Sequence, residues 1–546
     1  LGSATGFCVA VGTATGPTGQ VARTPVSFFV EGPSSTLTVR ATALPGTPAG
    51  GFGAYVRVVN LTDPLIFEAA VEVPAGGVTV RVPNGRYSVV GGVGDNTGDA
   101  TRFAFAGDAD VTVAGDTEVR LDGAAARPAT VTVEGVPTEE QAATIAYSQH
   151  GQRGAEWAEA QYVWHDMPWA QPALLIAPVA AAGIGAFDTY RYAGLDQPGD
   201  GPSGYQYDLI FTDRSFGADA ARVVTRAEQA RLARVEQRFL HTDGGVGDTS
   251  TDHKRYGITA TGYLLAERST RGVAAVRTDH LTPGRWVDEA FYRNGIVDYA
   301  IVTAEPERTV VAGGVEHRVW ARQPLRTDWV EAPEADLMSF CQPSPTRRTM
   351  GNLHVALAQL VDAHGRFDCL YEDVPNRRMS LYRDGRLIGQ AGEPVADFTV
   401  PRQAGTYRLT YDLSFGGTRA VTEAVSTAWT FRSTGPDSDE SALVPLLALD
   451  YELPMSGENH PDGDRATVLV RQMPGTRAQR IRSTTAWTSI DDGRTWQQAP
   501  VAAAGAARFT VGLPAVAAGT AVSLRVSAAG DGGSAIEQTM IRAYRR

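Results

Sequence analysis

The chain has 546 residues, more than the roughly 250 to 300 at which a single hydrophobic core stops growing, so several domains are expected. Hydrophobic residues make up 43% of the chain and charged residues 20%, a balance that excludes disorder by composition. The chain contains 49 Lys and Arg against 61 Asp and Glu, which gives a net charge of −12, and it has no run of clustered basic residues. Nucleic acid is therefore not expected as a partner.

The first third of the chain alternates apolar and polar side chains with a period of two. Gly, Pro, Asn and Asp interrupt this pattern at intervals of about 8 to 12 residues, which is typical of antiparallel sandwiches and barrels. Alternation places one face of each strand in a core and the other in water. The expected strands lie within Ser35–Leu44, Ala54–Asn60, Gly77–Val93, Ala109–Gly123 and Pro128–Val136.

Two segments of the middle third depart from the alternating pattern of apolar and polar residues. The longest apolar stretch, Pro172–Phe187, is shorter than the roughly 17 to 25 residues of a membrane-spanning helix and contains Pro178, so it predicts a buried strand pair and no membrane span. The segment Gly217–Gly245 is helical by propensity, yet its last third alternates apolar and polar residues. We expect a short helix before Gln229 and a strand from about Leu232 to His241.

The last third returns to short strands bounded by turn residues. Asp384-Gly385 is a dipeptide that suits a type I′ hairpin turn, and a polar linker, Ser433–Ser441, precedes a final module. The expected strands lie within Arg378–Gln390, Ala396–Phe415, Ser426–Ser433, Ala466–Met473, Thr485–Pro500, Ala507–Pro514 and Ala521–Gly530. The whole pattern predicts an all-β chain of tandem antiparallel β-sandwich modules, immunoglobulin- or fibronectin type III-like, with a larger central β domain.

Motifs of hydrolytic and zinc chemistry are missing from the sequence. There is no Gly-x-Ser-x-Gly elbow and no local signature of a subtilisin-type triad, although scattered residues could still assemble one. The nine histidines include no His-Glu-x-x-His and no His-x-His pair. No residue is therefore assigned a catalytic role, and whether the chain acts as an enzyme stays open.

Aromatic residues supply the candidate binding surface. His165 lies between Trp164 and Trp169, and Tyr205 and Tyr207 end a loop rich in Gly and Pro. Exposed, such rings would stack on sugars or contact a protein, whereas buried they would form an ordinary corner of a β core. Both interpretations stay open from sequence alone.

Calcium is the only cofactor that the sequence suggests. Calcium prefers oxygen ligands, and loops dense in Asp and Gly can supply them, although turn formation explains such loops equally well. No loop keeps the spacing of an EF-hand. The candidate ligands are Asp95, Asp99, Asp243 and Asp248.

Three cysteines allow at most one intrachain disulfide. Cys341 with Cys369 would close a loop of about 29 residues, worth about 3.5 kcal/mol in the chain-entropy treatment. The alternative is two buried thiols, and Cys8 is left without an assigned partner. The Gly- and Pro-rich composition favours the disulfide because it suggests an extracellular protein.

The segment Thr488–Gln498 fits the Ser-x-Asp-x-Gly-x-Thr-Trp spacing of an Asp-box, a hairpin motif of sialidases and other glycan-processing propellers. A propeller would repeat the motif in each blade, but the sequence holds one good copy. We therefore interpret Asp491, Gly493 and Trp496 as a structural hairpin: the carboxylate accepts hydrogen bonds in the turn, the glycine permits positive φ, and the indole packs on the strands.

The order of these elements resembles the C-terminal, non-catalytic region of large secreted subtilisin-like serine peptidases (subtilases) of high-GC Gram-positive bacteria. In that family a "S-x-D-x-G-x-T-W" hairpin is followed by a "V-S-L-R" strand and a terminal "T-I-I-R-A-Y", which Val522–Arg525 and Thr539–Tyr544 match here. The segments "MSLYRDGRLIG", "FTVPRQAGTYRLT" and "STAWTFRS" are similar to the preceding strands. The first 32 residues resemble the closing strands of a fibronectin type III-like domain.

The resemblance implies a domain plan and a function. The domains would be residues 1–32, 33–127, 128–345, 346–434 and 440–546, the first being the closing strands named above. The catalytic triad of such peptidases lies N-terminal to every matched segment, so no catalytic residue is carried over. The chain is expected to be a secreted, extracellular accessory region that supports an N-terminal subtilisin-like protease domain and binds a protein or glycan substrate or the cell envelope. The alternative is an independent extracellular glycan-binding or glycan-cleaving protein.

Overall fold

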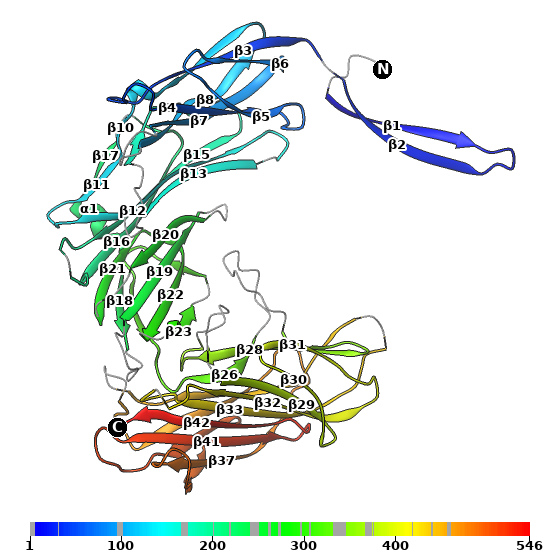
Figure 1. Cartoon of the computed structure of the whole chain (residues 1–546), viewed down its shortest axis with the longest axis vertical. Helices are drawn as coiled ribbons and strands as arrows, with labels where there is room; N and C mark the ends of the chain where they lie inside the picture. The colour runs from blue at the N-terminus through cyan, green and yellow to red at the C-terminus, as the bar shows by residue number, and fades with distance from the viewer. Residues whose placement is uncertain are drawn as a thin grey trace.

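The computed structural model describes residues 6–30, 32–95, 102–154, 156–164, 173–199, 201–217, 220–240, 250–259, 264–270, 273, 275–294, 297–304, 307–330, 345–365, 374, 376–417, 419–437, 440–455 and 460–546. These residues are almost entirely β-strands, which confirms the predicted all-β class. The molecule is elongated and curved, with a two-stranded arm at the N-terminal end and the C-terminal strands at the opposite end (Figure 1).

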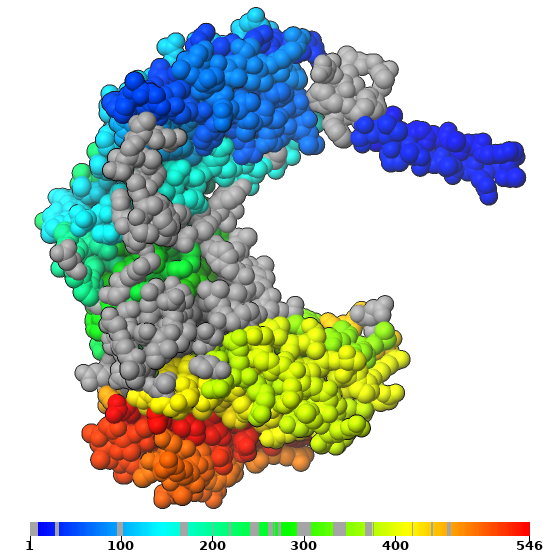
Figure 2. All heavy atoms as spheres, in the orientation of Figure 1, coloured from blue at the N-terminus to red at the C-terminus, as the bar shows by residue number. Residues whose placement is uncertain are grey.

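The arm is a single hairpin of two ten-residue strands. It consists of β1 (Gly6–Thr15) and β2 (Val21–Val30), which pair antiparallel along their whole length. Figure 2 shows the arm extending away from the body of the molecule.

The N-terminal domain is a sandwich of a six-stranded and a three-stranded sheet. Its own strands are β3 (Ser34–Thr42), β4 (Phe52–Asn60), β5 (Glu68–Glu72), β6 (Val78–Pro83), β7 (Gly85–Asp95), β8 (Arg102–Val113) and β9 (Thr117–Asp122). The period of two is visible in β9, where Val119 and Leu121 are buried and their neighbours are more exposed. The two sheets enclose a core that includes Leu37, Val58 and Tyr87.

The central domain contains a seven-stranded and a five-stranded sheet and a short parallel pair. Its elements are β10 (Arg127–Pro128), β11 (Thr130–Val133), β12 (Glu139–His150), β13 (Glu156–Trp164), β14 (Ala173–Ile176), β15 (Ala186–Asp196), β16 (Tyr205–Asp213), β17 (Ala221–Val224), α1 (Arg226–Gln229), β18 (Ala233–Phe239), β19 (Ser250–Ile258), β20 (Leu264–Thr270), β21 (Val276–Leu281), β22 (Gly284–Asn294), β23 (Val297–Ala304), β24 (Arg308–Val310) and β25 (Val315–Trp320). The seven-stranded sheet has the order β13-β12-β15-β16-β21-β18-β25.

The seven-stranded sheet is covered on both faces. The even-numbered positions of β15, such as Tyr192, pack toward the five-stranded sheet together with Val235 and Trp286. The odd-numbered positions, such as Leu195, pack on the parallel pair β11–β17. A strand with two covered faces explains why most of β15 is buried.

The short helix and the following strand lie where the sequence predicts them. Thr225 caps α1: its hydroxyl accepts a hydrogen bond from the amide of Glu228, and the Glu228 carboxylate accepts one from the amide of Thr225. In β18, Ala233, Val235 and Phe239 are buried, as the alternation indicates.

The apolar stretch 172–187 differs from the predicted strand pair. It contributes β14 and the first residues of β15, but these do not pair with each other. β14 instead joins the six-stranded sheet of the N-terminal domain beside β8, in the order β10-β14-β8-β7-β4-β5. The stretch therefore connects two domains, because each of its strands finds its hydrogen-bond partners in a different sheet.

The C-terminal half is built on one eight-stranded sheet, in the order β30-β29-β32-β33-β42-β41-β37-β38. Its elements are β26 (Arg326–Trp329), β27 (Arg347–Arg348), β28 (Asn352–Val361), β29 (Asn376–Arg383), β30 (Arg386–Ala391), β31 (Val395–Thr399), β32 (Gly405–Ser414), β33 (Ala424–Ser433), β34 (Ala442–Leu443), β35 (Leu447–Glu452), β36 (Arg465–Gln472), β37 (Ile481–Ser489), β38 (Gln497–Ala499), β39 (Val501–Ala503), β40 (Arg508–Gly512), β41 (Ala521–Gly530) and β42 (Ala535–Arg545). Asp384 and Gly385 both adopt positive φ, at 49° and 84°, as the predicted hairpin turn between β29 and β30 requires.

This sheet crosses the boundary expected between residues 434 and 440. β33, from the segment before the boundary, pairs with β42, the last strand of the chain. A single core joins Leu381 and Trp429 on one side of the boundary to Tyr544 on the other. The two expected modules thus share a sheet and a core.

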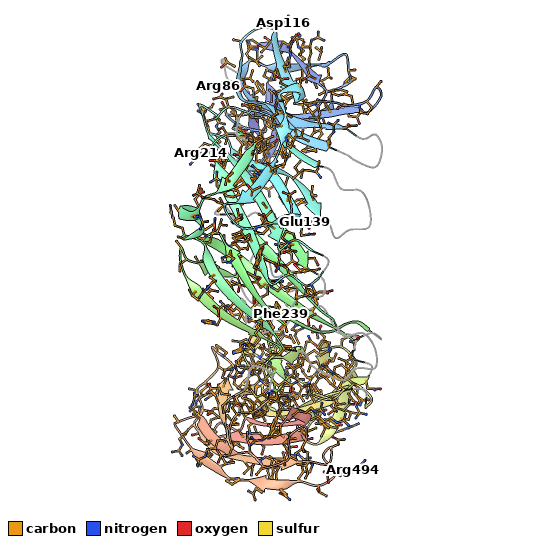
Figure 3. The ribbon with its side chains drawn as sticks, turned by 90° about the vertical axis from the view of Figure 1, so that its left-hand side faces the viewer. Arg86, Asp116, Glu139, Arg214, Phe239 and Arg494 are labelled. Atoms are coloured by element: carbon orange, nitrogen blue, oxygen red, sulfur yellow. The ribbon has the colours of Figure 1, made fainter. Side chains whose placement is uncertain are left out.

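The central and C-terminal domains meet around Phe239, which Figure 3 labels at the junction. Phe239 stacks on Trp320, with ring centroids 6.3 Å apart, and both belong to the hydrophobic cluster that continues into the C-terminal half. The two domains are therefore joined by a continuous hydrophobic cluster.

Candidate functional site

The largest group of buried charges lies between the two large sheets of the central domain. The guanidinium of Arg255 contacts Asp208, Asp279 and Asp288 at 2.6, 2.7 and 2.6 Å. Four arginines and four aspartates belong to this charge network: Arg255, Arg268, Arg277, Arg308, Asp196, Asp208, Asp279 and Asp288. The charges of these eight side chains balance and most of them are closed to solvent, so the network joins the two sheets through ion pairs.

Histidine 253 lies inside the same network. Its Nε2 is 3.0 Å from Oδ1 of Asp288, and its Nδ1 is 2.9 Å from Nη2 of Arg277. Burial and the neighbouring Arg277 lower the pKa of His253 to about 4, against the opposing effect of Asp288. The imidazole is therefore neutral at physiological pH.

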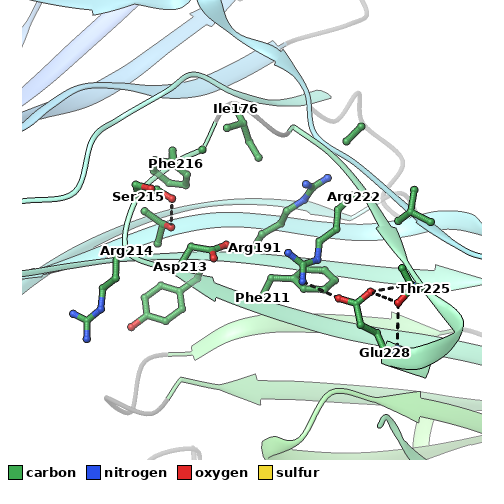
Figure 4. A pocket seen from close by; sticks show the side chains of 15 residues that line it. Ile176, Arg191, Phe211, Asp213, Arg214, Ser215, Phe216, Arg222, Thr225 and Glu228 are labelled. Atoms are coloured by element: carbon green, nitrogen blue, oxygen red, sulfur yellow. Dashed lines mark hydrogen bonds and ion pairs between the residues drawn. The ribbon is translucent and has the colours of Figure 1, made fainter. Parts of the chain in front are cut away.

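A cavity of about 590 Å³ opens on the other side of the seven-stranded sheet, between β15, β16 and β17 (Figure 4). The charged side chains that line it are three arginines and two carboxylates, namely Arg191, Arg214, Arg222, Asp213 and Glu228. Ile176 and Phe216 close one side with apolar groups, and Ser215 and Thr225 contribute polar ones.

Two of the three arginines have carboxylate partners. Arg222 reaches Glu228 at 3.3 Å and lies over the ring of Phe211, 4.1 Å from its centroid. Arg214 lies 3.1 Å from Asp188 and is mostly exposed. Each of these cations is therefore compensated within the protein.

Arg191 differs from both. It is only 9% exposed, its Nη1 donates a 2.7 Å hydrogen bond to the carbonyl oxygen of Ala220, and its Nη2 has no hydrogen-bond partner. Burial lowers the pKa of Arg191 to about 10, with a smaller contribution in the same direction from Arg222 and an opposing one from Glu140. The guanidinium stays protonated at neutral pH and lines the cavity (Figure 4).

Sequence reasoning did not select Arg191. Its strand carries Phe187, Thr189, Ala193 and Leu195 on the same face, so an arginine interrupts a mostly apolar face. This interruption is the feature of the sequence that could have indicated a buried arginine. It can be recognised only when the odd-numbered face of β15 is known to be covered by other strands.

The aromatic candidates do not form one surface in the described residues. Trp164 is the last residue of β13, in register with Ala142, whereas His165 and Trp169 lie outside the described residues. Tyr207 is 5% exposed and stacks on His280, with centroids 4.5 Å apart. Tyr205 is half-buried and donates its hydroxyl to the carbonyl oxygen of Pro137 at 2.7 Å. The two tyrosines thus serve the core and a loop contact.

The calcium and disulfide candidates fall largely on residues outside the description, namely Asp99, Asp243, Asp248, Cys341 and Cys369. Asp95 is described: it is buried and forms an ion pair with Arg102 at 2.6 Å. Within the described ranges, no three His, Cys, Asp or Glu side chains are grouped as ligands of a metal ion. No helix in the same ranges is long and apolar enough to cross a membrane.

The Asp-box folds as a tight turn between β37 and β38. The carboxylate of Asp491 accepts hydrogen bonds from the amide of Thr495 at 2.9 Å, from its hydroxyl at 2.6 Å and from the hydroxyl of Ser489 at 2.7 Å. Gly493 has φ of 81°, and Trp496 lies beneath the guanidinium of Arg525 at 4.2 Å. Every one of these contacts is internal to the C-terminal domain.

The hairpin arm is exposed on both faces. Residues 9–15 and 17–27 are all exposed, and they include Val9, Val11, Val21 and Val26, each 56 or 57% exposed. Within the described residues, neither β1 nor β2 pairs with a third strand, so each presents an edge of unpaired backbone groups. A two-stranded hairpin of this kind is marginally stable by itself.

No family model matches the chain, and no curated protein matches it. Two solved structures show weak likeness. One is the Bacillus anthracis TIE protein, at 8% identity and a TM-score of 0.12, with 57% of this chain covered and 58% of that one. The other is the human desmocollin-1 ectodomain, at 8% identity and a TM-score of 0.14, with 94% and 97% covered. TM-scores this low support no inference about fold or function.

Proposed function

We propose that this chain is a secreted, non-catalytic accessory region of a subtilisin-like serine peptidase, and that its hairpin arm attaches it to the rest of that peptidase. The observation that carries the proposal is the arm itself, whose two strands are exposed on both faces. The partner is a set of strands of the fibronectin type III-like domain that the first residues resemble.

The physical argument concerns the cost of leaving such a hairpin in water. Four valines on the arm are more than half exposed, and the outer edges of β1 and β2 offer unpaired backbone groups. Proteins normally cover or blunt edges like these, because they pair readily with other strands. Addition of neighbouring strands would satisfy the backbone and bury the valines in one step.

The rest of the chain supports a scaffolding role. Sheets are shared across neighbouring segments: β14 joins the N-terminal sheet, and β33 pairs with β42. The large clusters of charge are internally compensated. Such a body is suited to hold an attached domain at a distance from a surface or substrate.

The first experiment is co-purification. A tagged subtilisin-like peptidase, carrying its fibronectin type III-like domain without closing strands, is mixed with the full chain and recovered on the tag. We expect the unaltered chain to be retained and the double variant Val9→Asp, Val11→Asp to be lost, since charges on the arm oppose its burial. The matched control is Val311→Asp, which alters a valine that is 62% exposed on the body. Equal retention of all three proteins, or of none, would remove the support for the proposal.

A second experiment concerns catalysis. A fluorophosphonate probe labels activated serines, and we expect it to label the peptidase and leave this chain unlabelled. Labelling of any serine in the chain would contradict the non-catalytic assignment and favour a hydrolase built from scattered residues.

A further inference from the structure

The two outer edges of the hairpin arm differ in their chemistry. We infer that β1 is the edge that binds: a strand of the peptidase's fibronectin type III-like domain hydrogen-bonds to β1, and β2 remains the free edge of the enlarged sheet. This inference rests on the proposed function. It goes further by naming the edge of the arm that makes the contact and the kind of segment that this edge accepts.

The register of the arm determines which backbone groups point outward. In an antiparallel pair, directly opposite residues alternate between hydrogen-bonded and non-hydrogen-bonded pairs. Beside the turn, the amide of Gly16 donates a 2.8 Å hydrogen bond to the carbonyl oxygen of Gln20, so these two residues form a hydrogen-bonded pair. Counted from there along the register, the odd-numbered residues of both strands form the non-hydrogen-bonded pairs. Their amides and carbonyls therefore point away from the other strand, toward the outer edges of the arm.

The outer edge of β1 is continuous. Its outward positions include Val9, Val11, Thr13 and Thr15, each of which offers one amide and one carbonyl. Within the described residues, no strand other than β2 pairs with β1, and β1 contains no charged residue and no proline. Residues 9–15 present this row of groups over roughly 24 Å. An extended peptide strand is the occupant that fits, because it carries donors and acceptors at the same spacing.

The outer edge of β2 is interrupted. Pro25 lies opposite Val11, so it occupies an outward position, and proline has no amide proton to donate. Its ring stands where that proton would point, which keeps an incoming strand from the ladder spacing. Arg23, at the neighbouring outward position, is exposed and adds a charge to this edge. Proline and charge are two features that protect sheet edges from further pairing. The edge of β2 therefore suits solvent, and the edge of β1 suits a partner strand.

The test places proline at two residues that lie directly opposite each other, Val9 on β1 and Ser27 on β2. Both are outward positions, so proline at either one leaves the hydrogen bonds between β1 and β2 in place. The tagged peptidase of the co-purification experiment is immobilised and titrated with the full chain. We expect Val9→Pro to bind at least about tenfold more weakly than the unaltered chain, and Ser27→Pro to bind within about twofold of it.

The outcomes separate the choice of edge from the attachment itself. Equal binding by the two proline variants, or weaker binding by Ser27→Pro, would overturn the assignment of β1 and leave the arm as the point of attachment. Failure of the unaltered chain to bind would remove the proposed function, and this inference with it. Sedimentation of the chain alone examines a second copy as the occupant: a dimer that Val9→Pro dissociates would overturn the choice of partner.

Hydrogen exchange provides a readout that needs no substitution, and it decides the question if a proline variant fails to fold. When the unaltered chain binds the peptidase, the amides of residues 9–15 should become more protected, because the outward ones gain hydrogen-bond partners. The amides of residues 21–27 should exchange as they do in the free chain. Equal gains of protection in the two segments, or a gain in residues 21–27 alone, would contradict the assignment of β1.

Discussion

The Nε atom of Arg255 lies 2.6 Å from Oδ1 of Asp288, and both side chains are closed to solvent between the two large sheets of the central domain. The same guanidinium also contacts Asp208 and Asp279. Burial by itself would raise the pKa of Asp288, yet Arg255 and Arg308 hold it well below its ordinary value. Arg255 thus contributes to the lowered pKa of all three carboxylates, together with Arg308 at Asp288, Arg277 at Asp279 and Arg268 at Asp208.

Replacement of Arg255 should therefore be severe. Arg255→Met leaves three buried aspartates without their shared cation, and we expect a loss of about 3 to 5 kcal/mol in the free energy of unfolding. Urea denaturation followed by tryptophan fluorescence measures it, since Trp286 and Trp320 belong to this domain. The control is Arg40→Met, which breaks an exposed pair with Glu118 and should cost less than about 1 kcal/mol. Similar losses in the two variants would show that the network contributes no more than a surface pair.

His253 gives the central domain a dependence on pH. Its pKa is lowered from 6.5 to about 4 in the folded chain, so between these values the unfolded chain binds more protons than the folded one. The contribution of His253 to the free energy of unfolding is complete above pH 6.5 and is lost as the pH falls toward 4. The loss from this residue amounts to at most about 3 kcal/mol.

The measurement compares thermal midpoints at pH 7 and pH 4.5 for the unaltered chain and for His253→Gln. Because glutamine does not titrate, the variant should lose less stability than the unaltered chain over this interval. The reverse order would mean that the buried imidazole accepts a proton without cost.

Local patterns account for most of the strands because one face of each is buried. The alternation in Thr117–Asp122, the short helix expected before Gln229 and the turn at Asp384-Gly385 are each indicated by fewer than about a dozen neighbouring residues. Their physical causes act between near neighbours, so the sequence predicts them without knowledge of the fold.

Pairings between strands that lie far apart in the sequence cannot be predicted from such local patterns. Nothing near Ala424–Ser433 indicates that it pairs with Ala535–Arg545, and the shared sheet was not predicted for this reason. The charge network is hidden similarly: Arg255 and Asp279 resemble the solvent-facing half of alternating strands, and only the covering sheet makes them buried. Arg191 was not selected from the sequence because its surroundings depend on β17, a strand from a different segment of the chain.

Asp491 is expected to matter for stability and not for binding. Hydrogen bonds from the hydroxyl and amide of Thr495, together with one from Ser489, lower the pKa of its carboxyl to about 2. A depressed pKa stabilises the folded chain above the ordinary value near 4 and loses that effect as the pH falls toward 2. At pH 7, Asp491→Ala should have a lower thermal midpoint than the unaltered chain. This difference between the two midpoints should become smaller as the pH falls from 4 to 2. Asp464→Ala, at an exposed aspartate of the same domain, should leave the midpoint unchanged; an equal effect of both variants would contradict a special role of the turn.

Gly493 tests the same turn through the backbone. Its φ of 81° is rarely adopted by other residues, and a Cβ at this position would lie 2.9 Å from Cδ1 of Ile541 and 3.2 Å from Cζ2 of Trp496. Gly493→Ala should therefore cost about 1 to 3 kcal/mol, measured as a shift of the urea midpoint. Gly519→Ala is the matched control, because that glycine has the same φ of 81° and open space around its Cβ position. A larger loss at Gly493 than at Gly519 isolates the clash with Ile541 and Trp496 from the cost of positive φ, whereas equal losses would show that the turn yields freely to the added methyl group.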